Sequence, residues 1–236
     1  MARDLTPLAA LGLALSEVLP EGVTFAVEDP SQPEGKDDLF ASEAAAMTRA
    51  VPVRRAEFAA GRRAAHRAMD DLGVLPAPVP MAADRAPEWP EGLVGSISHC
   101  EGAAVAVLGF SGVHAALAVD VEPDLGLPRD LHDLVCTEAE RAWLSGLEPG
   151  ARDRAARKLF SAKECVYKLQ FAQGGKLLNF SDVEVVIDVD HGAFEARFLC
   201  DAGRYGAQEV VQGRCLAVGG FIICFMSALQ DIEIVA

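Results

Sequence analysis

Apolar and polar positions alternate in a pattern that divides the 236-residue chain into helical and strand-like segments, occurring twice in the same order. The first half of the pattern predicts helices over residues 1–20 and 42–72, the latter split at Pro52, and strands over 23–27, 93–98 and 103–108. The second half predicts a strand over 115–121, helices from Thr137 and over 151–171, and strands over 183–189, 193–200 and 215–226. We therefore expect an α+β chain in two halves, residues 1–118 and 119–236, forming one compact unit.

Local signals refine this pattern at the ends of the predicted elements. Thr137 is followed three residues later by Glu140, which is the spacing of a helix capping box. Residues 74–92 contain five prolines and separate the first helices from the next strands. An irregular connection of this length is uncommon in a compact domain, so it indicates a functional segment.

Composition and charge exclude several classes of protein. The chain carries a formal charge of −14 and is 51% hydrophobic, which argues against disorder and against a general nucleic-acid or anionic-membrane binder. Its six cysteines form no C-x-x-C pair, and no apolar run reaches the length of a transmembrane helix. We expect a cytoplasmic protein with reduced thiols and no transmembrane segment.

Basic residues are concentrated in two helical segments, which is unusual in so acidic a chain. Twelve of the 21 lysines and arginines lie within residues 49–68 and 152–168. Arg54 and Arg62 are eight residues apart and fall on nearly the same side of one helix. Arginine matches phosphate oxygens well, so the clusters favour an anionic ligand; a solvated basic helix face is the alternative.

Acidic residues form a second candidate site. Asp120 and Glu122 end an apolar strand, where alternation places both carboxylates on one face. Such a pair suits a hard divalent ion, although an ordinary acidic pair in a turn has the same pattern. Glu164 and Lys168 share a face of the later helix, where an exposed salt bridge is the alternative to a role in chemistry.

Five motifs in order resemble the 4′-phosphopantetheinyl transferases, in particular their larger, pseudo-twofold class and its siderophore-synthesis branch, which includes enterobactin synthase component D. The motifs are Arg54-Arg55-Ala56-Glu57-Phe58 with Gly61-Arg62, Asp84-Arg85-Ala86-Pro87-Glu88-Trp89-Pro90, Gly95-Ser96-Ile97-Ser98-His99, Asp120-Val121-Glu122, and Phe160-Ser161-Ala162-Lys163-Glu164 with Lys168. The similarity runs from about Arg54 to Phe180. Ala118, Phe160 and Cys165 depart from the usual family residues by small or apolar exchanges, and Met81 stands where some relatives have a basic residue.

The resemblance implies an enzyme with its active site in a cleft between the two halves. There, the serine of an apo acyl, peptidyl or aryl carrier protein attacks the β-phosphorus of coenzyme A, and adenosine 3′,5′-bisphosphate leaves. It implies Mg²⁺ ligation by Asp120, Glu122 and Glu164, with Glu164 also the candidate general base. Lys163 and Lys168 are then expected to contact phosphate during catalysis. Binding of coenzyme A is expected from Arg54, Arg62, Arg85, Ser98, His99, Lys163 and Lys168.

Two other functions fit subsets of these residues. A Mg²⁺-dependent phosphohydrolase of coenzyme A or a nucleotide uses the same carboxylates and cations. A regulatory protein that only binds coenzyme A needs the cations but leaves the three carboxylates unexplained. The motifs leave open the carrier protein and its pathway (fatty-acid, polyketide, siderophore or other peptide synthesis) and the choice between Mg²⁺ and Mn²⁺. A monomer is the expectation from the two similar halves.

Overall fold

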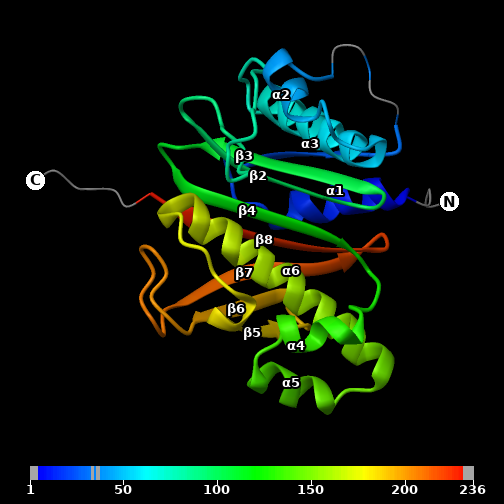
Figure 1. Cartoon of the computed structure of the whole chain (residues 1–236), viewed down its shortest axis with the longest axis vertical. Helices are drawn as coiled ribbons and strands as arrows, with labels where there is room; N and C mark the ends of the chain where they lie inside the picture. Colours follow the sequence, from blue (N-terminus) through cyan, green and yellow to red (C-terminus); the bar gives the residue numbers. More distant parts are fainter. Residues whose placement is uncertain (1–4, 33–34, 36–37, 231–236) are drawn as a thin grey trace, which may run out of the picture. The chain divides into compact units, whose positions relative to one another are not determined.

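The structure is a computed structural model that describes residues 5–32, 35 and 38–230, and Figure 1 shows its helices and strands. The helices are α1 (Pro7–Val18), α2 (Ala41–Ala46), α3 (Pro52–Asp71), α4 (His132–Val135), α5 (Glu138–Ser145) and α6 (Pro149–Gly174). The strands are β1 (Thr24–Glu28), β2 (Leu93–Cys100), β3 (Ala103–Phe110), β4 (His114–Pro123), β5 (Val183–Asp188), β6 (Ala193–Phe198), β7 (Val210–Val218) and β8 (Phe221–Leu229). This order confirms the predicted α+β class. The first four residues of the predicted N-terminal helix, and four residues of the loop over 29–38, lie outside the described residues.

The chain divides into two compact units. Unit 1 comprises Met1–Val119 with Ser227–Ala236, and unit 2 comprises Asp120–Met226. The first sheet has the strand order β1-β3-β2, and the second has the order β4-β8-β7-β6-β5. None of the helices in the described ranges combines the length and apolar composition needed to cross a membrane.

Unit 1 is built around α3, which packs on β1 and β3 (Figure 1). The buried side of α3 is rich in alanine, with Ala64, Ala65 and Ala68 each fully buried. Small side chains let the helix approach the sheet closely. Gly61 shows this directly, because a Cβ at this position would lie 2.9 Å from Cγ2 of Ile97 on β2. The close approach brings Arg62, the residue after Gly61, next to Ile97 and His99 of β2.

Unit 2 pairs the long helix α6 with an antiparallel meander that begins at β5. The prediction of a single strand over 215–226 was wrong, because β7 and β8 form a hairpin there. Gly219 and Gly220 connect the two strands with φ values of 61° and 84°. Two consecutive residues with positive φ are the requirement of a type I′ turn, so the glycine pair is a hairpin signal rather than part of a strand.

A buried glutamate holds each long helix to its neighbours, and the two arrangements correspond. In unit 1, Glu43 accepts hydrogen bonds from Phe40 N, Val79 N and His66 Nε2. In unit 2, Glu140 accepts them from Thr137 N and Val185 N and forms an ion pair with Lys163. The capping box predicted at Thr137 is confirmed.

The side chain that pairs with each glutamate, His66 or Lys163, lies 23 residues beyond it, on the long helix of the same unit. Both long helices also begin at a proline, Pro52 in α3 and Pro149 in α6. A short helix, a long helix and a buried backbone amide thus meet at one carboxylate in each unit.

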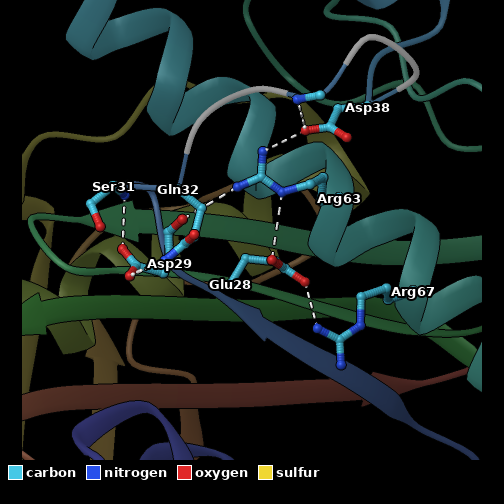
Figure 2. A network of polar contacts seen from close by, with 8 residues as sticks. Glu28, Asp29, Ser31, Gln32, Asp38, Arg63 and Arg67 are labelled. Atoms are coloured by element: carbon cyan, nitrogen blue, oxygen red, sulfur yellow. Dashed lines mark hydrogen bonds and ion pairs between the residues drawn. The ribbon is translucent and has the colours of Figure 1, made fainter.

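Part of the arginine cluster on α3 serves this framework (Figure 2). The Arg63 guanidinium lies between Asp38, at 2.9 Å, and Glu28, at 3.5 Å, and donates to Asp29 O. Arg67 forms an ion pair with the same Glu28 at 2.5 Å. These two arginines tie α3 to the end of β1 and to the segment that follows it, so they are structural.

His114, the first residue of β4, is a buried titratable group with no hydrogen-bond partner on either ring nitrogen. It is 1% exposed, and its ring packs against Gly109. Desolvation lowers the pKa of His114 below its usual 6.5. The folded chain therefore holds this imidazole neutral, whereas the unfolded chain takes up the proton below about pH 6.5.

We predict that His114 makes the chain sensitive to mild acid. Well above pH 6.5, His114 is neutral in both states. As the pH falls, the unfolded state takes up a proton at His114, whereas the folded state, in which the pKa is lowered, stays neutral. The free energy of unfolding of the wild type should therefore fall between pH 7 and pH 5.5 more steeply than that of His114→Leu. Urea titrations at several pH values measure this. His191→Gln, at an exposed histidine, is the control, and parallel curves for wild type and His114→Leu would refute the prediction.

Candidate active site

The acidic end of β4 carries the two predicted strand carboxylates. Asp120 is 4% exposed and Glu122 is half-buried, while Val121 between them is fully buried and belongs to the apolar core. This alternation places the two carboxylates on the same face of the strand, as expected from strand geometry. Asp120 is the first residue of unit 2 in the chain, so both carboxylates belong to that unit.

A polar stripe on α6 faces these carboxylates. Its members are Arg157, Ser161, Glu164 and Lys168, whose spacing of four, three and four residues repeats on one face of a helix. Lys168 Nζ lies 2.8 Å from Asp120 Oδ1, and the Ser161 hydroxyl donates to Asp120 Oδ2 at 2.8 Å. Arg157 forms an ion pair with Glu122 at 2.8 Å. The predicted common face of Glu164 and Lys168 is confirmed by their electrostatic interaction.

Burial and like charge strain the carboxylates electrostatically. Burial, followed by the charge of Asp120, raises the pKa of Glu122 to about 7 against the opposing effect of Arg157. Burial also raises the pKa of Glu164; Asp120 adds to this, and Lys168 opposes it. Burial opposes the charge of Lys168, yet its ion pair with Asp120 raises the pKa of Lys168 overall. The two cations, Arg157 and Lys168, therefore do not balance the charge of the three carboxylates.

The donor chemistry of this cluster suits a hard divalent cation, since all three acidic groups offer oxygen ligands and repel one another. Between Leu5 and Gln230, in the parts that the structure describes, no three His, Cys, Asp or Glu side chains form a ready-made metal site. Arg157 and Lys168 instead occupy oxygens of Glu122 and Asp120. A metal ion at this place has to share these oxygens with the two cations or displace them.

Lys163 lies differently from its predicted place among the phosphate ligands. Its side chain is 1% exposed, and its ammonium forms an ion pair with Glu140 at 2.7 Å. The same nitrogen donates to Val135 O and Phe180 O. Lys163 is one residue from Glu164, but one residue turns a helix by about 100°, so the Lys163 side chain lies off the polar stripe and reaches Glu140.

A cavity of about 620 Å³ opens beside Glu164 in unit 2. Its apolar lining includes Leu134, Tyr167, Leu177 and Phe180, and its polar and charged lining includes Asp133, Lys163, Glu164, Asn179 and Ser181. Leu134 and Leu177 are largely exposed, at 64% and 75%. The volume lies in the usual range for small-molecule sites, and the lining mixes apolar, polar and charged side chains.

Unit 1 contains a small basic pocket of about 110 Å³. Its lining includes the predicted Arg54, Arg62, Arg85 and His99, together with Glu57, Phe58, Gly61, Met81, Pro87 and Ile97. The structure thus brings together four residues that are far apart in the sequence. Arg54 Nη1 is hydrogen-bonded to His99 Nε2 and lies 3.5 Å from Glu57. The predicted common side for Arg54 and Arg62 is confirmed.

Two of the pocket arginines are held in unusual ways. Arg62 is 5% exposed, donates from Nε to Val79 O at 2.7 Å, and lies 4.1 Å from the Phe58 ring centre. Burial, with the nearby charge of Arg54, lowers the pKa of Arg62 to about 10, against the effect of Glu43. Arg85 has a φ of 72°, which is rare outside glycine and concentrates at ligand-binding turns.

The proline-rich connection over 74–92 presents Arg85 on a short turn. Met81 and Pro87 pair as an antiparallel bridge across it, and Arg85 N donates to Ala82 O. The other predicted residue of this half, Ser98, does not line the pocket. Alternation along β2 explains this, because His99 and Ile97 face the pocket and Ser98, between them, faces the other way.

Together these features define an α+β protein with a carboxylate cluster in one unit and a phosphate-sized basic pocket in the other. The profile of the 4′-phosphopantetheinyl transferase N-terminal domain matches residues 42–109, and that of the 4′-phosphopantetheinyl transferase superfamily matches residues 116–225. The chain belongs to this superfamily. Its activity is the transfer of 4′-phosphopantetheine from coenzyme A to carrier proteins.

Relatives with this activity match most of the chain. It is 37% identical over 207 residues to the 4′-phosphopantetheinyl transferase Svp of Streptomyces mobaraensis, covering 85% of this chain and 84% of the relative. It is 36% identical over 193 residues to PptT of Mycobacterium tuberculosis, covering 80% and 84%. Enterobactin synthase component D of Salmonella typhimurium is 36% identical over 135 residues, covering 56% and 54%. The transferase is thus favoured over both alternative functions.

Sequence reasoning missed two residues of the acidic site, Arg157 and Ser161. Arg157 was visible only as one member of a basic run, and Ser161 only as a motif residue. The missing signal was helical spacing, because both residues lie on the face already marked by Glu164 and Lys168. Their partners on β4 lie at least 35 residues earlier in the sequence, so no local pattern could supply the pairing.

We predict that Lys163 stabilises the fold through Glu140. Lys163→Met leaves a buried carboxylate without its cation, which costs about 3 to 5 kcal/mol of unfolding free energy. The double variant Lys163→Met, Glu140→Gln removes the charge as well and should recover much of that loss. Urea unfolding monitored by fluorescence measures both. Unchanged stability of Lys163→Met with a loss of transferase turnover would restore Lys163 to the catalytic machinery.

Proposed function

We propose that the chain carries out its transfer with Mg²⁺ bound by Asp120, Glu122 and Glu164. The observation that carries this is that Asp120 and Glu122, at the end of β4, contact the polar stripe of α6 to which Glu164 belongs. When bound, the metal ion neutralises phosphate charge and polarises the phosphoryl group under attack. Mn²⁺ has similar oxygen-ligand preferences and is expected to substitute for it.

Glu164 is the proposed general base for the carrier serine. Its half-buried position raises the pKa of its carboxyl, which makes the carboxylate a better proton acceptor near neutral pH. It accepts the serine proton directly or through a water molecule as the serine oxygen bonds to the β-phosphorus. The phosphoanhydride bond breaks, and adenosine 3′,5′-bisphosphate leaves with the bonding electron pair. Lys168 contributes positive charge beside the reacting phosphates.

The remaining binding roles divide between the units. Arg54, Arg62, Arg85 and His99 are proposed to bind phosphate of coenzyme A, because they line one basic pocket in unit 1. The cavity beside Glu164 in unit 2 is proposed to hold the uncharged pantetheine chain. Ser98 contributes to this proposal only through its backbone. Lys163 is left out of it, since its ammonium is bound inside the protein.

The partner is an apo carrier protein, and the siderophore branch is the finer proposal. Support comes from the match to enterobactin synthase component D, although Svp and PptT match a larger share of the chain. The test is a panel containing an apo peptidyl carrier domain of a siderophore synthetase and an apo acyl carrier protein of fatty-acid synthesis. A higher kcat/KM for the peptidyl carrier supports the branch, and equal or reversed values contradict it.

Removing either proposed magnesium ligand should stop transfer without unfolding the chain. Glu164→Gln should lower kcat by about 10²- to 10⁴-fold, because the amide cannot accept the serine proton. Asp120→Asn keeps one acceptor oxygen but loses the second acceptor and the charge, so it should also raise the Mg²⁺ concentration required. Intact-protein mass spectrometry of the carrier, with an EDTA control reversed by added Mg²⁺, measures the phosphopantetheine adduct. Near-normal turnover of a variant removes that residue from the mechanism.

Arg54→Ala should mainly weaken the binding of coenzyme A. Loss of the charged hydrogen bonds should raise the KM for coenzyme A by about 10-fold. This is the lower end of the range for hydrogen bonds to charged groups, because Arg54 is partly exposed. The matched control is Arg67→Ala, which removes an arginine from the same helix but from the network with Glu28 (Figure 2). Steady-state kinetics distinguish the two. An equal rise in KM for both variants would assign the effect to general charge rather than to the pocket.

A further inference from the structure

Ser161 lies at the centre of the polar stripe and is its most deeply buried member. Its residue is 0% exposed, whereas Arg157, Glu164 and Lys168 are only partly buried. A hydroxyl in such a place costs free energy unless it forms hydrogen bonds, and alanine is the better helix former. Neighbouring Ala162 and Cys165 show that small apolar side chains are accommodated on this part of α6. There must therefore be a specific reason for a serine, and not an alanine, at position 161.

That reason is the orientation of Asp120. A serine hydroxyl has one proton, and at Ser161 this proton is donated to Asp120 Oδ2 at 2.8 Å. Lys168 holds the other oxygen, Oδ1, at 2.8 Å. The carboxylate is thus gripped at both ends, which fixes its plane. Each carboxylate oxygen has two lone pairs, so an oxygen that accepts a hydrogen bond can also bind a cation.

The Ser161 side chain also interacts with a side chain of the neighbouring sheet. The side chain of Cys224 on β8 hydrogen-bonds with Ser161, and that of Cys215, opposite it on β7, hydrogen-bonds with Cys224. A buried chain of four side chains therefore runs from the sheet through α6 to the end of β4.

We propose that Ser161 is a positioning residue that orients the Asp120 carboxylate for binding of the divalent cation. The proposal rests on the metal role of Asp120 put forward above. Ser161 acts through Asp120 and touches neither substrate nor metal. Residues that hold a metal ligand in this way typically change metal affinity or activity by about 10- to 100-fold when they are mutated.

The decisive measurement is Mn²⁺ binding by the chain with coenzyme A present and no carrier, followed by electron paramagnetic resonance. Ser161→Ala should raise the Mn²⁺ dissociation constant by about 10-fold or more, because Asp120 loses the donor that holds its Oδ2. Ser161→Thr retains the hydroxyl and should bind Mn²⁺ within about 3-fold of wild type, as a donor of the same kind is present. The Mg²⁺ concentration for half-maximal transfer should follow the same order.

The matched control is Thr24→Val in unit 1. Thr24 donates its hydroxyl to Ala68 O at 2.7 Å, so the variant removes a side-chain hydrogen bond without touching a carboxylate. It should lower the thermal midpoint and leave the Mn²⁺ dissociation constant unchanged. If Ser161→Ala behaves in the same way, Ser161 is only a structural residue and the proposal is overturned.

A second comparison separates this proposal from the one on which it rests. Asp120→Asn should weaken Mn²⁺ binding at least as strongly as Ser161→Ala. Weakened binding in Asp120→Asn with unchanged binding in Ser161→Ala refutes the role of Ser161 alone. Unchanged binding in both variants refutes the metal role of Asp120 and, with it, the inference.

Discussion

The buried glutamate in each unit is the interaction on which the rest of the structure depends. Glu43 and Glu140 each satisfy the first turn of a short helix, a backbone amide distant in sequence, and a cationic or titratable group on a long helix. A carboxylate so deeply buried is tolerated only because every one of these donors is present. Each glutamate therefore fixes the register of its long helix. This register in turn sets the positions of the candidate site residues on α3 and α6.

The two long helices use the same framework for different chemistry. On α3, alanine and Gly61 bring the backbone close to β2, so that Arg54 and Arg62 reach His99 in one pocket. On α6, the corresponding length carries a stripe of three charged side chains and one hydroxyl that reaches the end of β4. The buried glutamate is thus repeated in both units, while the other faces of the two long helices differ. As a result, this acidic chain has one basic site beside α3 and one acidic site beside α6.

The sequence was sufficient wherever the determining interaction is local. Apolar periodicity found α3, α6 and the strands up to β6, and the capping box found the start of α5. The sequence was not sufficient where one pattern fits two structures. At Gly219, the residues of a hairpin turn were included in a predicted strand. It also failed for Lys163, because adjacency to Glu164 in a motif says nothing about the face on which a side chain lies. The partner of Lys163, Glu140, follows only from tertiary packing.

The charge of the acidic site explains why a neutral donor is found at its centre. Three carboxylates there are opposed by two cations, Arg157 and Lys168, which leaves negative charge to attract a metal ion. A lysine or arginine at position 161 would orient Asp120 equally well but would cancel that remaining charge and compete for the same oxygen. An apolar side chain would keep the charge and lose the orientation. Of the common hydrogen-bond donors, a small hydroxyl such as that of Ser161 holds the ligand in place and leaves its charge available.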